Sequence, residues 1–179
     1  TLDRNELIIH ELIHSARMSL SSTRFEEEFA YSTSQSLLRR ILSPITQKPT
    51  DSILFAIFAL FSVASDLPKF PRWTSILTKF PLSFVVLAGL IRLLRTKRAL
   101  KQAHKYLEFI GCVPQRNIKP FLFRLTDEEI LNLSQRYTNI RLSVGSRQKE
   151  TEQHNYRSYV NRKAINNLRW SILANYLTP

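Results

Sequence analysis

The sequence predicts a mainly α-helical chain of three parts: a helical hairpin that carries an HExxH motif (residues 1–43), a short membrane-embedded helical hairpin (53–94), and a C-terminal helical region (95–179). Three observations support this fold class. No proline or glycine interrupts residues 1–43. Two long apolar runs follow, without the alternation that is typical of a half-buried strand. Helix start and stop signals then recur toward the C-terminus.

The first helix is predicted around the segment NELIIHELIHSARM, which contains His10, Glu11 and His14. Residues four apart lie on one face of a helix, so the two imidazoles can hold one zinc ion. Glu11 lies off that face and can act as general base toward a water on the metal. Because many surface helices carry two histidines at this spacing and bind nothing, the neighbouring segment decides the interpretation.

The second helix is predicted to begin at a capping box formed by Thr23 and Glu26. It is expected to extend to about Leu42, because Pro44 cannot continue it. The short connection between the helices predicts an antiparallel hairpin, which brings the first turn of the second helix near His14. That turn carries three carboxylates, and a catalytic zinc uses three protein ligands with one position left for water.

Four residues are candidates for the third ligand: Glu26, Glu27, Glu28 and, from far along the chain, His154. Glu26 is the capping-box partner, so its carboxylate is expected to face the helix start. Glu28 lies about 100° further round the helix than Glu27. Glu27 has Tyr31 at i+4 on its own face, where the phenol can support a ligating carboxylate. We therefore predict Glu27 as the third ligand.

The stretch IIHELIH, followed shortly by EEEFAY, resembles the HExxH zinc metallopeptidases, the zincins, over about residues 7–42. It is most similar to the gluzincin-type branch, whose third ligand is a glutamate of the following helix, often in an E-x-x-A pattern; here that pattern is EEFA. The resemblance implies three zinc ligands, His10, His14 and Glu27. It also implies Glu11 as the general base.

The segment before the motif departs from the zincin pattern. Zincins usually place a β-sheet before the HExxH helix, and its edge strand holds the substrate, whereas only nine residues precede His10 here. We therefore expect either further residues upstream of Thr1 or a substrate cleft of another kind.

The composition narrows the partners and the kinds of site. Twenty-six Lys and Arg against fourteen Asp and Glu give a net charge of +12, which favours anionic partners such as lipid headgroups or nucleic acid. The sequence has no recognisable RNA or DNA module, so nucleic acid is not the expected partner. A single cysteine, Cys112, excludes an internal disulfide and a cysteine-based zinc site.

Two apolar runs, residues 53–67 and 80–94, follow a turn-rich linker at residues 44–52. Each run is shorter than the ~20 residues that span a bilayer upright, as expected for buried helices of a soluble core. Both runs are, however, apolar on all faces, and the second can extend back to Trp73. We therefore predict a membrane hairpin of two spans, with a hairpin that dips into one leaflet as the alternative.

Basic residues predict the topology of this hairpin. Arg39, Arg40 and Lys48 precede the first run, and a larger group ends or follows the second run as far as Lys105. The connecting loop carries only three basic residues, Lys69, Arg72 and Lys79, against this combined total. The positive-inside rule therefore places both termini in the cytoplasm. The HExxH helix would then lie at the cytoplasmic membrane surface.

The rest of the chain is predicted to be helical. A basic helical region covers residues 95–142, in which Gly111 ends the helix that continues from the second apolar run. Thr126 and Glu129 form a further capping box, which opens a helix to about Arg136.

The C-terminal part is predicted as a polar linker at residues 143–152 and one amphipathic helix within residues 153–179. That helix is expected to begin near Gln153, and its broad apolar stripe must pack on another part of the molecule.

Two function classes follow from these features. One is a membrane-associated zinc-dependent metallopeptidase that hydrolyses a peptide or protein substrate with a zinc-activated water. Tyr31, or a tyrosine or arginine of the C-terminal helix, would stabilise the oxyanion. The other is a non-enzymatic membrane hairpin adaptor whose basic cytoplasmic tail binds anionic lipid or a partner protein. The metal content of the purified protein separates the two.

Overall fold

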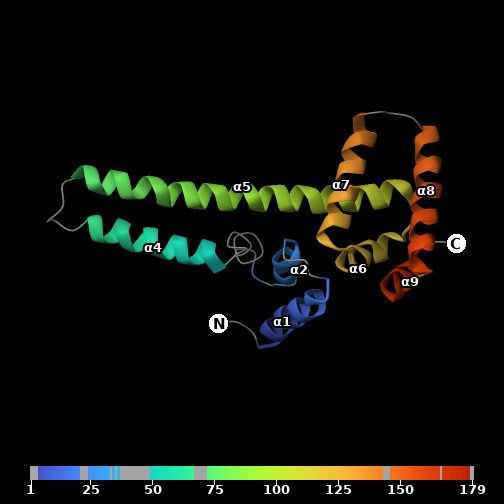
Figure 1. The fold of residues 1–179 in the computed structure, drawn as a ribbon, viewed down its shortest axis with the longest axis horizontal. Helices are drawn as coiled ribbons and strands as arrows, with labels where there is room; N and C mark the ends of the chain where they lie inside the picture. Colours follow the sequence, from blue (N-terminus) through green and yellow to red (C-terminus); the bar gives the residue numbers. More distant parts are fainter. Residues whose placement is uncertain are drawn as a thin grey trace. The chain divides into compact units, whose positions relative to one another are not determined.

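The computed structural model describes residues 4–20, 24–32, 34, 36, 49–66, 72–142, 146–165 and 167–177. Over these residues the chain is mainly α-helical, as predicted, and none of them lies in a strand. The chain divides into two compact units, whose helices are drawn in Figure 1. The first consists of Thr1–His14 and Thr23–Thr96, and the second of Ser15–Ser22 and Lys97–Pro179.

Two short helices begin the chain. α1 spans Arg4–Met18 and contains the whole HExxH motif without a break. α2 spans Glu26–Ser32 and is held in place by the fully buried side chains of Phe25 and Ala30. Thr23, one half of the predicted capping box, lies outside the described residues.

α2 is shorter than predicted. It ends at Ser32 and not near Leu42. The serine-rich sequence gives the reason. The Ser32 hydroxyl donates to the carbonyl of Phe29 at 2.7 Å, and the amide of Ser36 donates to the hydroxyl of Ser34. Such side chains compete with the backbone for helix hydrogen bonds and favour turns. The rest of the predicted helix and its basic residues, at 37–48, lie outside the described residues.

α4 and α5 contain the two apolar runs. α4 spans Pro49–Ser65, so it begins inside the predicted linker, as expected where proline occupies the first turn. α5 spans Arg72–Ile110 and joins the second apolar run and the basic segment in one continuous helix. It ends at Gly111, as predicted. The φ of Gly111 is 65°, and its amide donates to the carbonyl of Leu107 at 3.1 Å.

One helix among the described residues, Leu77–Ile110, is long and apolar enough to cross a membrane. Its most apolar window is only 11% buried, whereas a core helix of a soluble domain buries most of such a window. The apolar part of α4, Ser52–Ser65, is shorter. The described residues therefore support one span by length and composition, and not the two spans that the sequence predicts.

In the part that the structure describes, the second unit contains the C-terminal part of α5 and five elements that follow it. These are η2 (Gln115–Asn117), α6 (Ile118–Phe123), α7 (Asp127–Leu142), α8 (Ser146–Ala164) and α9 (Leu168–Ala174). Its core is formed by large apolar and aromatic side chains, among them Tyr106, Leu107, Ile110, Ile118, Phe121, Ile130, Val160 and Leu173.

The predicted capping box opens α7. The amide of Thr126 donates to Glu129 Oε2 at 2.8 Å, and the amide of Glu129 donates to the Thr126 hydroxyl at 3.3 Å. The helix then continues to Leu142, beyond the predicted end near Arg136.

The C-terminal helix is two helices and not one. α8 begins at Ser146, before the predicted start near Gln153, so most of the segment predicted as a polar linker is helical. The break before α9 has a local cause. Asn167 has an extended backbone, and its side chain accepts a hydrogen bond from the amide of Arg169 at 3.0 Å. Asparagine is more favourable at such an N-cap than inside a helix.

Arg17, in the last turn of α1, is completely buried, although no pattern in the sequence predicts this. Its guanidinium donates to the carbonyls of Phe123 at 2.7 Å and Leu125 at 3.4 Å. It also forms an ion pair with Asp127 at 3.1 Å. A buried cation requires such partners. These contacts fix the end of α1 within the second unit.

Candidate metal centre

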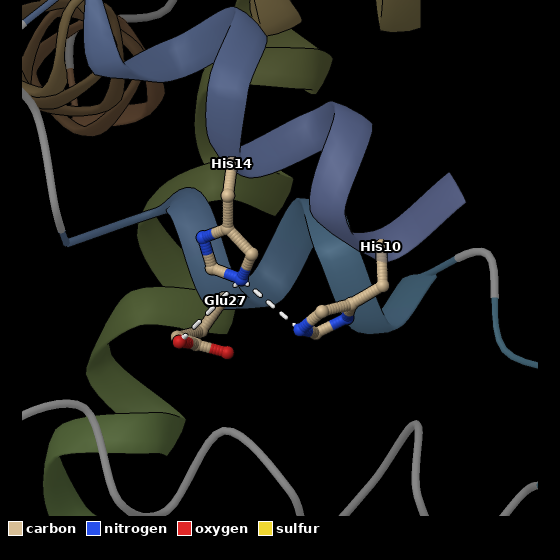
Figure 2. Close-up of side chains that lie close together, drawn as sticks. All are labelled: His10, His14 and Glu27. Carbon is tan, nitrogen blue, oxygen red and sulfur yellow. Dashed lines mark hydrogen bonds and ion pairs between the residues drawn. The ribbon is translucent and has the colours of Figure 1, made fainter. Parts of the chain in front are cut away.

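Three side chains of α1 and α2, those of His10, His14 and Glu27, converge on one point (Figure 2). Their donor atoms all lie within 4.8 Å of one another. His14 Nε2 is 3.0 Å from His10 Nε2 and 3.8 Å from Glu27 Oε1. All three residues are half-buried. Within the part of the chain that the structure describes, no other set of three histidine, cysteine or acidic side chains lies this close together.

The spacing of these donor atoms fits a small tetrahedral cation. Zinc–nitrogen bonds of about 2.0–2.1 Å place two ligands of a tetrahedral site about 3.3 Å apart. The distance between the two Nε2 atoms, 3.0 Å, is within a few tenths of an ångström of that value. The distance from His14 Nε2 to Glu27 Oε1, 3.8 Å, is about half an ångström longer than zinc requires. Two of the three donor spacings therefore lie within about half an ångström of those in a tetrahedral zinc site.

Glu26 fixes the orientation of His14. Its Oε1 lies 2.7 Å from His14 Nδ1, and because a carboxylate only accepts, Nδ1 carries the proton and donates. Neutral His14 then has its lone pair on Nε2, the atom that faces His10 and Glu27. The predicted capping bond of Glu26 involves Thr23 and lies outside the described residues, while the described partner of Oε1 is the partly buried imidazole of His14.

The signal for this second role of Glu26 was present in the sequence. A short connection brings the first turn of α2 beside His14, and each half-buried imidazole has two ring nitrogens that need partners. Three consecutive glutamates can therefore supply both a metal ligand and an anchor for the ligating histidine. The prediction assigned these glutamates a ligand and a helix cap, and not an anchor for His14.

Tyr31 and Glu11 lie next to the three converging residues. The ring of Tyr31 packs against the ring of His10, with centroids 4.7 Å apart and planes at 58°. Tyr31 was predicted to support Glu27, and the contact that the structure records is with His10. Glu11 is exposed on α1, about 100° round the helix from His10. This carboxylate beside the ligand face is therefore accessible from solvent.

The other two candidate ligands do not join the group. Glu28 is half-buried on α2, and its carboxylate does not lie among the three converging donors. His154 is exposed on α8, in the second unit. Cys112 is buried in the second unit, and burial raises the pKa of its thiol. This favours a role as an apolar filler over a role as nucleophile.

Comparison with known proteins identifies no relative: no family model, no curated protein and no solved structure matches the chain. The resemblance to zincins therefore rests on residues 7–42 alone. The arrangement of His10, His14 and Glu27, with Glu26 behind His14, carries the functional argument.

Proposed function

We propose that the chain is a membrane-associated zinc-dependent metallopeptidase in which His10, His14 and Glu27 hold the metal. One observation carries this proposal: two imidazoles and a carboxylate converge within 4.8 Å. A hydrogen-bonded carboxylate behind a ligating imidazole is a common feature of zinc sites, and Glu26 supports the proposal in this way. Bound zinc would supply Lewis-acid activation of a water and of the peptide carbonyl.

The neighbouring residues take the remaining roles in peptide hydrolysis. Glu11 accepts the proton of the attacking water and passes it to the leaving amine. Tyr31, which already packs on His10, donates its hydroxyl proton in a hydrogen bond to the developing oxyanion. His10, His14 and Glu27 would hold the metal, and a zinc with three protein ligands would keep a position available to water.

Exposed apolar surface supports a membrane location. α1 exposes Leu7, Ile8 and Leu12, of which Leu12 is 61% exposed, so the HExxH helix can lie in the interface of a bilayer. α5 supplies one span, and we propose that α4 enters the membrane beside it. The hydroxyls of Ser65 and Thr78, 2.8 Å apart, join the two helices at one end. The basic residues that flank these helices favour cytoplasmic termini.

The metal content of the purified protein tests the proposed activity. Full-length protein in a mild detergent is expected to contain about one zinc per chain by elemental analysis, because the three donors match the ligand set of a catalytic site. The double variant His10→Ala, His14→Ala is the control and is expected to contain none. Wild-type protein that stays free of zinc even after incubation with the metal would favour the non-enzymatic membrane adaptor.

Carbonate extraction of membranes tests the location. The protein is expected to remain in the pellet at high pH, because the apolar window of α5 is only 11% buried within the chain. A peripheral protein held by charge alone serves as the control and should be released. Release of the chain into the supernatant would mean that α5 is covered by protein in the cell.

A further inference from the structure

A second candidate site lies in the second unit, on the basic part of α5. A cavity of about 320 Å³ is lined by Arg98, Lys101, Gln102 and Lys105 of α5 and by Tyr137 of α7. We call it the basic pocket. Its volume is at the lower end of the range for small-molecule sites.

The side chains of the basic pocket present hydrogen-bond donors. Arg98, Lys101 and Lys105 can only donate, and the Tyr137 hydroxyl can donate as well. The hydroxyl of Ser134, which is buried, donates to Gln102 Oε1 at 2.7 Å. This bond orients the amide of Gln102 and leaves its NH₂ group as a donor to the cavity. No carboxylate lines the pocket. Such a set of groups suits an oxyanion.

The positive charge of the pocket is not compensated. Within the described residues, none of the three cations forms an ion pair with a carboxylate. Glu108 is the one acidic residue on this stretch of α5, and it is exposed and does not line the pocket. All three cations are exposed, so solvent screens them in part, and together they still make the cavity attractive to an anionic ligand.

An apolar stripe leads along α5 to the pocket. Leu87, Ile91 and Leu94 precede Arg98 at spacings of four, three and four residues, so all of them lie on one face of the helix. Their exposed fractions are 53%, 42% and 46%. Arg98 lies about 6 Å beyond Leu94 along the helix axis. One headgroup layer of a bilayer is about as thick, so Arg98 is at headgroup depth when Leu94 is at the edge of the hydrocarbon.

We propose that the basic pocket binds the phosphate of an anionic phospholipid, whose acyl chains lie along Leu87, Ile91 and Leu94. The donors select the charged headgroup, and the apolar stripe selects a lipid over a free phosphate ion. Lys101 and Lys105 extend beyond the headgroup layer and fold back onto the phosphate with their long side chains. This site shares the membrane location with the proposed peptidase and does not depend on the metal.

Binding of three soluble probes to the full chain in a neutral detergent tests the site. Short-chain dioctanoylphosphatidylglycerol is expected to bind with one molecule per chain by isothermal titration calorimetry. Dioctanoylphosphatidylcholine, which lacks the net charge, and inorganic phosphate, which lacks acyl chains, should each bind at least about tenfold more weakly, a difference of 1.4 kcal/mol. Equal affinity for the two lipids would overturn the headgroup site. Equal affinity for inorganic phosphate would assign the pocket to a free anion instead.

Single variants separate a specific site from general charge attraction. Lys101→Gln is expected to weaken phosphatidylglycerol binding about fivefold, as for the loss of one cation near an anionic lipid. Tyr137→Phe removes one hydrogen bond without changing charge and should cost about two- to tenfold. Lys119→Gln, at an exposed position of α6, removes the same charge outside the pocket and should have no effect. An equal loss in Lys119→Gln and Lys101→Gln, or unchanged binding in both pocket variants, would overturn the proposal.

Discussion

The variant Glu11→Gln is expected to keep its zinc and to lose peptide hydrolysis. Glutamine has nearly the same shape as glutamate, and Glu11 is exposed on α1 outside the three converging donors, so the ligand set stays intact. Glutamine cannot take up the proton of the attacking water, and loss of a general base lowers the rate by about 10²–10⁴-fold. The measurement is cleavage of fluorescein-labelled casein by the zinc-loaded full chain in detergent, together with zinc content.

Glu108→Gln is a matched control for this variant, since Glu108 is an exposed glutamate of α5 and should retain full activity. Two results would contradict the role of Glu11. Loss of zinc in Glu11→Gln would make Glu11 a ligand. Full hydrolysis with zinc retained would assign proton transfer to another group.

The elements that could be predicted from the sequence are those with local causes. The capping box of Thr126 and Glu129 forms as predicted, because its two hydrogen bonds involve residues three apart. Gly111 ends α5 for a similar reason, since its positive φ is a property of that residue alone. The two histidines and the first turn of α2 also come together for local reasons. His10 and His14 are one helical turn apart, and only a short segment separates α1 from α2.

The features that could not be predicted depend on competition between partners. α2 ends at Ser32 because serine side chains compete for backbone groups, and the outcome depends on which bonds are geometrically available. Arg17 is buried because acceptors about a hundred residues later in the chain receive its N–H groups. No local pattern identifies such partners. Arg17 lies three residues after His14 on the same face of α1, and this spacing indicates only that the Arg17 side chain points inward.

The two glutamates beside His14 are expected to differ sharply in their effect on zinc affinity. Glu27 is the proposed ligand, so Glu27→Gln replaces a charged oxygen donor with a weak neutral one. Glu26 contacts His14 Nδ1 at 2.7 Å and acts through the imidazole. Removal of such a supporting carboxylate typically lowers metal affinity about 10–100-fold. Glu27→Gln should therefore lose more affinity than Glu26→Gln, and the measurement is competition with a chromophoric zinc chelator.

Glu28→Gln supplies the matched control, because it makes the same chemical change at the next position of α2 and its carboxylate is not among the three converging donors. Its zinc affinity should equal that of the wild type, provided that circular dichroism shows all three variants folded. The distances argue for this order. Glu27 Oε1 lies on the Nε2 side of His14, at 3.8 Å, while Glu26 lies on the Nδ1 side. A metal at Nε2 can reach the first carboxylate and not the second without turning the ring. Greater loss in Glu26→Gln than in Glu27→Gln would mean that the ring does turn, with Nδ1 as the ligand atom and Glu26 as the third ligand.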